Sequence, residues 1–245
     1  MSEFRRYYLK IALWFYAVWV VVFIAEGFYA VTLPTQDLTL WVDRKIPVVS
    51  GFVWIYFLCY FFPLLPVCIS KNWHRFNIAL LSIALCSLIA FVFHIAIPVS
   101  FPRLELGTSF SDRVLCFVYE ADFRPNAQNF PSLHVAIAWI IYFACRNQGL
   151  RRLWEWMIFF VTCLFVASTV LIKQHLVADL VGGTVLAFTC WYSLSRYYAL
   201  SNHESDDARF ALLRTVRKSA HIFLSTTFVM LGIVSYQILR NIIRN

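Results

Sequence analysis

FNIALLSIALCSLIAFVFHIAIP, residues 76–98, contains no acidic residue, lysine or arginine. A helix needs about 20 mostly apolar residues to cross a bilayer, so this stretch predicts a membrane span. Further apolar runs lie on either side of it, at 8–31, 51–69, 132–145, 155–172, 176–198 and 220–239. We therefore expect an all-α, polytopic membrane helical bundle with six core transmembrane helices and a seventh near the C-terminus.

The overall composition supports one membrane domain. Apolar side chains make up 61% of the chain and charged ones only 14%, whereas soluble domains have roughly half and a quarter. We expect a single domain over 1–245, with a core at about 8–198 and an extra C-terminal helix at about 220–239. The run at 132–145 is short, so it is either tilted or begins inside the preceding loop. No removable signal peptide is evident, so the first run should remain as an anchor.

The basic residues indicate topology rather than nucleic-acid binding. The net charge is +8, but lysine and arginine lie in short clusters between apolar runs instead of along one face. Thirteen of the 21 basic residues fall on the N-terminal side of the spans and eight on the other. The positive-inside rule then places the N-terminus in the cytosol and, with seven spans, the C-terminus outside.

Neither the cysteines nor the acidic residues predict a metal site. Of the seven cysteines, only Cys116 lies in an outer loop. No Cys/His spacing matches a zinc site, and no cluster of Asp and Glu suggests another metal. We therefore expect no disulfide framework, no metal and no cofactor.

The first candidate segment ends the longest outer connection, residues 99–131. It contains NFPSLHVA, residues 129–136. Proline and serine before an apolar run are typical of a helix start, with Ser132 as its cap. The positive end of a helix is a natural anion site, and His134 would lie in its first turn. His94, isolated within the third apolar run, is instead assigned to packing or hydrogen bonding.

The second candidate segment is STVLIKQHLVAD, residues 168–179. Lys173, His175 and Asp179 interrupt membrane-compatible sequence, where ionisable groups are costly and usually functional or paired. If a helix begins near His175, Asp179 lies one turn further along the same face. Its carboxylate can then bind one imidazole nitrogen, fix the tautomer and make the other nitrogen more basic. With alternating topology, both candidate segments emerge on the same non-cytosolic side.

The two segments together resemble the second and third motifs of the type-2 phosphatidic acid phosphatase superfamily. The matching elements are PSLH at 131–134 and Ser168 with His175 seven residues later and Asp179 four beyond it. That family has six core spans, with these motifs in the third-to-fourth and fifth-to-sixth connections, so the resemblance extends over most of the chain. It implies an active site on the non-cytosolic side of the membrane.

The resemblance also implies roles for individual residues. His175 would be the nucleophile that takes the phosphoryl group, Asp179 its orienting carboxylate, and His134 the general acid that protonates the leaving oxygen. Ser132, Ser168 and nearby basic residues would hold the phosphate oxygens, and the scheme needs no metal.

The cations of this chain depart from the family pattern. The third motif usually begins Ser-Arg, whereas Thr169 follows Ser168 here, and Lys173 would supply the positive charge. The family's first motif is a lysine followed, after six residues, by Arg-Pro. This sequence contains no literal copy of it. Arg103 in PVSFPR, residues 98–103, resembles the proline-flanked arginine of a divergent branch that includes inositol phosphorylceramide synthases. We favour Arg103 as the first-motif arginine, with Arg124 as the alternative. Purely structural roles stay open for both residues. Lys173 could extend to the membrane interface, and Arg103 could anchor a loop.

The implied function is a membrane lipid phosphate phosphatase that acts on a phosphomonoester or pyrophosphate. Its partners would be a lipid phosphate and the bilayer, and no nucleic acid. Release of the phosphohistidine by an alcohol such as inositol or a ceramide headgroup, rather than by water, would make it a phosphotransferase. A transporter or a non-catalytic lipid-binding protein is an alternative of another class, since such proteins also place ionisable groups inside a bundle.

Overall fold

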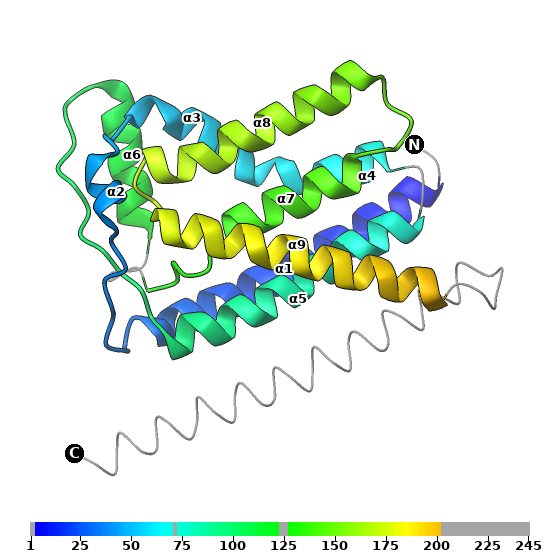
Figure 1. Cartoon of the computed structure of the whole chain (residues 1–245), viewed down its shortest axis with the longest axis horizontal. Helices are drawn as coiled ribbons and strands as arrows, with labels where there is room; N and C mark the ends of the chain where they lie inside the picture. The colour runs from blue at the N-terminus through cyan, green and yellow to red at the C-terminus, as the bar shows by residue number, and fades with distance from the viewer. Residues whose placement is uncertain (1–2, 71–72, 123–126, 202–245) are drawn as a thin grey trace, which may run out of the picture. The chain divides into compact units, whose positions relative to one another are not determined.

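The computed structural model describes residues 3–70, 73–122 and 127–201, and these residues form helices without strands (Figure 1). The long helices are α1 (Glu3–Ala30), α5 (Trp73–Ala96), α8 (Arg152–Leu171) and α9 (Val177–Ser201). Five described segments are long and apolar enough to cross a membrane: Leu9–Ala30, Ser50–Ile69, His74–Ala96, Arg152–Leu171 and Val177–Tyr197. The all-α, polytopic bundle is thereby confirmed.

The C-terminal part of the prediction is not covered by these residues. The expected seventh helix at 220–239 and most of the loop before it lie outside the described part of the chain. Residues 1–196 form one compact unit and residues 197–245 a second, and the candidate site lies within the first. A single domain over the whole chain stays a prediction.

The long helices expose large apolar side chains, as a lipid-facing surface requires. Trp14 on α1, Phe160 on α8 and Val185 on α9 are all exposed. In water such a surface would be costly, whereas in a bilayer it is matched to its solvent.

The second span is not one regular helix. It consists of η1 (Ser50–Phe52), α3 (Val53–Tyr56), η2 (Phe57–Tyr60), η3 (Phe62–Leu64) and α4 (Leu65–Ile69). Pro63 and Pro66 lie in the first turns of η3 and α4. Proline lacks an N–H and its ring clashes with the preceding turn, so the winding changes near these residues, and a turn at Phe61 separates η2 from η3.

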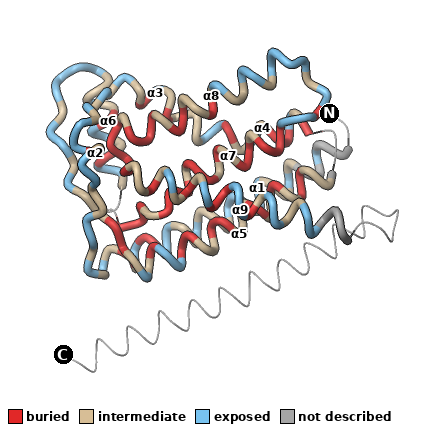
Figure 2. The backbone as a smooth tube through the Cα atoms, in the orientation of Figure 1, coloured by how far each residue is buried: buried red, intermediate tan, exposed pale blue. Residues whose placement is uncertain are grey.

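A short helix, α7 (Leu133–Cys145), occupies the centre of the bundle. Its 13 residues extend only about 20 Å, less than the roughly 30 Å hydrocarbon layer. It packs against α4, α5 and α8, and most of its residues are buried (Figure 2). Trp139 of α7 also donates a hydrogen bond to Thr184 of α9. Because protein rather than lipid surrounds α7, it does not need the length of a lipid-exposed span.

A non-helical and mostly buried segment, residues 127–132, leads into α7. Its backbone is bonded to neighbouring chain: the Val99 N–H donates to Ala127 O at 3.3 Å and the Asn129 side chain donates to Val99 O at 2.7 Å. Non-helical backbone at membrane depth is tolerated when protein satisfies its polar groups. The helix of the short fourth span thus begins at Leu133, directly after this buried loop, and its tilt stays a prediction.

The polar connection before that loop folds over one end of the bundle, together with α2 (Trp41–Lys45) (Figure 1). It contains α6 (Phe110–Ala121), whose first turn is closed by reciprocal bonds between Ser109 and Asp112. The α6 helix packs on η1 and α3 and buries Leu115 and Tyr119. The Tyr119 hydroxyl donates to Ile172 O at 2.5 Å, which attaches α6 to the turn between α8 and α9.

Candidate active site

His134 lies at the start of α7, in the position that the sequence predicts. The Ser132 hydroxyl accepts a hydrogen bond from the Val135 N–H at 3.3 Å, so the predicted helix cap is confirmed. The Ser132 N–H donates to the backbone oxygen of Asp179 at 3.1 Å. This bond joins the start of α7 to the first turn of α9, and it therefore sets the spacing of the two candidate segments.

The turn between α8 and α9 presents His175. The N–H groups of Gln174 and His175 both donate to Thr169 O, at 2.9 and 3.0 Å. Lys173 has a φ of 53°, in the left-handed region that L residues rarely adopt. This conformation reverses the chain within a few residues and places His175 two residues before α9 begins at Val177.

Asp179 is behind His175, as predicted from the four-residue spacing. Its Oδ2 accepts the Leu176 N–H at 2.8 Å and lies 3.5 Å from His175 Nδ1. The helix starts slightly later than expected, so Asp179 caps the first turn of α9 as well as facing the imidazole. The carboxylate side chain is fully buried and the His175 side chain is 5% exposed, so a proton on His175 Nδ1 would face the carboxylate in surroundings of low dielectric.

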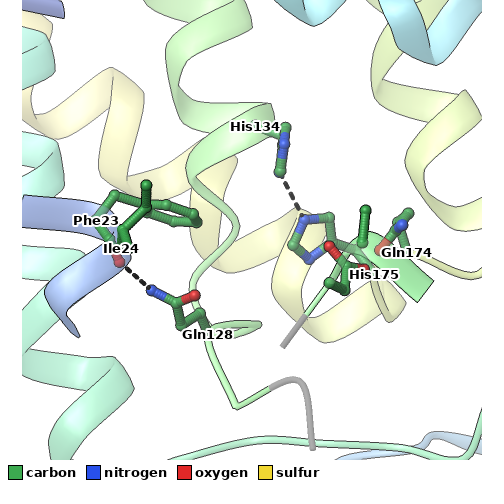
Figure 3. Close-up of a pocket in the computed structure, with 8 residues that line it drawn as sticks. Phe23, Ile24, Gln128, His134, Gln174 and His175 are labelled. Carbon is green, nitrogen blue, oxygen red and sulfur yellow. Dashed lines mark hydrogen bonds between the residues drawn. The ribbon is translucent and has the colours of Figure 1, made fainter. Parts of the chain in front are cut away.

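The two imidazoles meet at the end of the bundle that the polar connection covers. His134 Nδ1 lies 3.1 Å from His175 Nε2, and the ring centroids are 5.3 Å apart. Figure 3 shows this contact as a dashed line between the two rings, which come from different segments. Forty-one residues separate them in the sequence, so only the packing of α7 against α8 and α9 brings them together.

A cavity of about 340 Å³ opens beside the histidine pair. Its wall combines the two imidazoles with polar groups and with apolar side chains of α1 (Figure 3). The lining residues are Phe23, Ile24, Ala121, Asp122, Gln128, His134, Gln174 and His175. The volume falls in the lower part of the range for small-molecule sites, enough for a phosphorylated headgroup with its tail directed elsewhere.

Arg103 lies next to this wall but is bound to protein groups. Its guanidinium donates to Asp122 at 2.7 Å, to the Gln174 side chain at 2.9 Å and to Lys173 O. It also stacks over the ring of Tyr119, 4.5 Å from the centroid. Arg103 thus fixes the positions of two cavity residues, and its predicted direct contact with phosphate stays a prediction.

Asp122 adds a carboxylate to the cavity. Burial raises the pKa of its carboxyl group, while the charge of Arg103 acts in the opposite direction. Burial likewise raises the pKa of the neighbouring Tyr119 hydroxyl to about 12, so that group stays a hydrogen-bond donor at neutral pH. The cavity therefore presents one anionic or acidic group close to the imidazoles.

Lys173 is held by α2. Its Nζ donates to Asp43 O at 2.6 Å, and Asp43 Oδ1 accepts the Val177 N–H at 2.8 Å. Burial lowers the pKa of Lys173, and the nearby charge of Asp43 opposes this change. Asp43, which belongs to no sequence motif of the site, therefore anchors both sides of the His175 turn.

The remaining predicted phosphate ligands do not line the cavity. Ser168 donates to Phe165 O at 2.6 Å, within its own helix, and Ser132 is used as the helix cap. Arg124, the alternative first-motif arginine, lies outside the described residues. Their binding of phosphate stays a prediction, as do the catalytic roles of His134, His175 and Asp179.

Two polar contacts were not anticipated from the sequence. The Tyr56 hydroxyl lies 3.0 Å from His134 Nε2, although the sequence places Tyr56 among apolar residues that give no signal of a site. His94 Nδ1 lies 3.5 Å from Glu26 Oε2, and His94 Nε2 contacts Pro131 O at 3.3 Å. His94 thus hydrogen-bonds to a backbone carbonyl through Nε2, in line with the packing or hydrogen-bonding role expected from its isolated position, and its Nδ1 lies near a carboxylate of α1.

Within the described residues, no group of three or more His, Cys, Asp or Glu side chains is arranged to hold a metal ion. The two imidazoles are suited to acid, base and nucleophilic chemistry. One ring is backed by a carboxylate and the other is close enough to exchange a proton with a group bound at the first.

Comparison with known proteins gives one match. Residues 33–193 match the family model described as the PAP2 superfamily, a range that includes both histidine segments and more than half of the chain. Neither the curated proteins nor the solved structures give a match.

Proposed function

The chain belongs to the PAP2 superfamily, and we propose that it is a membrane lipid phosphate phosphatase that works through a phosphohistidine. Membership gives a phosphatase-type, lipid-related function at the level of the superfamily. The observation that supports the finer proposal is the 3.1 Å contact between His134 Nδ1 and His175 Nε2, with Asp179 behind His175.

The first half-reaction uses both histidines. The carboxylate of Asp179 favours a proton on His175 Nδ1, so the lone pair of Nε2 is free to attack phosphorus. A nitrogen–phosphorus bond forms while the bond from phosphorus to the lipid oxygen breaks. His134 donates a proton to that oxygen, and the lipid alcohol leaves.

The second half-reaction restores the enzyme. A water molecule attacks the phosphohistidine, His134 accepts one of its protons, and inorganic phosphate leaves with His175 Nε2 free again. The two rings are too close for a phosphoryl group to fit between them, so substrate must first displace His134 from His175. The cavity beside the pair provides the space for that entry.

A transferase is the second candidate, and a specific part of the cavity favours it. Asp122, Gln128 and Gln174 line the wall next to the histidines, and carboxylate and amide groups are suited to bind hydroxyl groups. An alcohol such as inositol or a ceramide headgroup bound there would replace water in the second half-reaction. The product would then be a transferred headgroup instead of inorganic phosphate.

The decisive experiment is a substrate panel with purified protein. Phosphatidic acid, phosphatidylglycerol phosphate, polyprenyl diphosphate and lipid A phosphate would be supplied with and without inositol or ceramide, and free phosphate and transferred headgroup measured. We expect turnover of at least one lipid and its loss, by about 10⁴-fold or more, in His175→Ala. With a substrate radiolabelled in its phosphoryl group, the wild type should carry an acid-labile label as phosphohistidine. This label should be absent from His175→Ala.

Other outcomes would redirect the assignment. Full activity in His175→Ala would remove the proposed nucleophile. Binding of lipid phosphate without turnover, unchanged in His175→Ala, would favour the transporter or non-catalytic lipid-binding alternative.

For topology, we propose a cytosolic N-terminus and a non-cytosolic active site, supported by the distribution of basic residues. Cys116 on α6 and Cys68 on α4 are both exposed, and these two helices lie near opposite ends of the bundle (Figure 1). A membrane-impermeant thiol reagent added outside intact cells should label Cys116 and leave Cys68 unlabelled. The reverse pattern would contradict the proposed orientation.

A further inference from the structure

Tyr56 is the last residue of α3, and it is buried against the candidate general acid. The residue is 5% exposed, and its ring lies parallel to that of Phe165 with centroids 6.2 Å apart. Its hydroxyl is 3.0 Å from His134 Nε2. Packing thus fixes the ring, and the hydroxyl is directed at one particular nitrogen of His134.

The two other tyrosines near this region lack such a contact. Tyr60, one turn further along the second span, is exposed. The Tyr119 hydroxyl is engaged with the backbone oxygen of Ile172. Among these three phenols, only that of Tyr56 is directed at the histidine pair.

The positions of the protons follow from the chain of contacts. A carboxylate only accepts hydrogen bonds, so Asp179 favours a proton on His175 Nδ1. Neutral His175 then has a bare Nε2, which needs a donor, and the atom facing it is His134 Nδ1. A neutral His134 with its proton on Nδ1 has a bare Nε2 in turn, and the Tyr56 O–H is positioned to donate to it.

The opposite direction of hydrogen-bond donation is unfavourable at Asp179. If Tyr56 accepted a proton from His134 Nε2, then His134 Nδ1 would be bare and His175 would have to hold its proton on Nε2. His175 Nδ1 would then point a lone pair at the carboxylate of Asp179, 3.5 Å away. Donation therefore runs from Tyr56 through His134 to His175, whose Nδ1–H would face the carboxylate of Asp179 at 3.5 Å.

We propose that Tyr56 is a positioning residue that makes Nδ1, rather than Nε2, the nitrogen through which His134 delivers its proton. This inference rests on the proposed phosphatase function. A phenol can both donate and accept, so its hydroxyl can serve His134 in both protonation states. When His134 becomes an imidazolium, the hydroxyl rotates and accepts from Nε2–H, while Nδ1–H stays directed at the reacting phosphoryl group.

Tyr56→Phe tests this role because it removes one oxygen and keeps the ring that packs on Phe165. The test compares a lipid phosphate, whose alkoxide is a poor leaving group, with p-nitrophenyl phosphate, whose phenolate leaves without a proton. We expect kcat for the lipid phosphate to fall by about 10- to 100-fold, part of the 10²- to 10⁴-fold that general acids contribute. The KM for the lipid phosphate should stay nearly constant. The kcat for p-nitrophenyl phosphate should fall far less than the kcat for the lipid phosphate.

Two variants serve as controls. In His134→Ala, kcat for the lipid phosphate should again fall more than kcat for the aryl phosphate, and the fall should be larger than in Tyr56→Phe. Tyr60→Phe removes an exposed hydroxyl from the same span and should match the wild type. An equal loss on both substrates in Tyr56→Phe, or no loss, would overturn the role of Tyr56. Retained lipid turnover in His134→Ala would instead overturn the proposed general acid.

A second measurement does not depend on turnover. The measurement is NMR of protein labelled with ¹⁵N-histidine, in which the signal of His134 is identified by its absence from His134→Gln. In the wild type, His134 should have a protonated Nδ1 and a bare Nε2. Tyr56→Phe should shift the population toward Nε2–H. A wild-type His134 with its proton on Nε2 would refute the proposal whether or not a substrate has been found.

Discussion

The bundle contains two buried imidazole–carboxylate pairs with almost the same internal geometry. His175 Nδ1 lies 3.5 Å from Asp179, and His94 Nδ1 lies 3.5 Å from Glu26. The surroundings of the second nitrogen differ. His175 Nε2 faces His134 beside the cavity, whereas His94 Nε2 contacts the carbonyl of Pro131. A buried histidine with an acidic partner is therefore not enough for a site, because the other nitrogen must also face the place where a ligand can bind.

The same short loop joins the two pairs. Pro131 O contacts His94, and the Ser132 N–H donates to Asp179 O. Gln128 donates to Glu26 and also lines the cavity. The His94–Glu26 pair thus supports the loop from α1 and α5, while the His175–Asp179 pair contacts it from α9. We interpret the first pair as structural and the second as catalytic.

The largest difference between the pairs should appear when each carboxylate is replaced by its amide. Asp179→Asn removes the charge behind His175 and permits the wrong tautomer, so we expect kcat for a lipid phosphate to fall by about 10²- to 10⁴-fold. Glu26→Gln should keep most of the activity, since the amide oxygen of glutamine can still accept the hydrogen bond from the Gln128 side chain. Steady-state kinetics of both variants on one substrate would measure this contrast.

The outcome that would remove the distinction is equal loss in both variants. Thermal unfolding of each protein in detergent should accompany the kinetics. A loss of activity in Glu26→Gln that follows its loss of stability would still fit a structural pair.

A smaller effect should follow from disturbing the loop that joins the pairs. A Cβ at Gly183 on α9 would overlap the carbonyl oxygen of Ser132, a backbone atom that cannot move independently. Gly183→Ala should therefore destabilise the protein by about 1–3 kcal/mol, the usual cost of overpacking. It should also lower kcat by displacing His134 relative to His175. Thermal denaturation and phosphate release would measure the two effects.

Gly51→Ala is the matched control, because a Cβ there meets nothing within 4 Å. Alanine forms helix better than glycine, so this variant should be as stable as the wild type or slightly more stable. If Gly183→Ala also proved neutral, the close approach of α9 to the loop would not be needed to hold the two histidines together.

Much of the fold was predictable because lipid makes strong demands on sequence. The first, third, fifth and sixth apolar runs correspond to α1, α5, α8 and α9 with small differences at their ends. The second run is helical but is interrupted near Pro63 and Pro66. The short α7 could not be understood from its own residues, since its burial by neighbouring helices explains why 13 residues are sufficient.

Within the candidate site, the sequence by itself determined the contacts that lie within one turn of a helix. The cap of Ser132 on Val135 and the approach of Asp179 to His175 follow from spacings of three and four residues, which helical geometry brings together. Tertiary structure alone decided the partners from distant segments: Tyr56 for His134, Asp43 for Lys173, and Asp122 and Gln174 for Arg103. Such pairs depend on how whole helices pack, and local periodicity holds no information about which side chains will face one another across that packing.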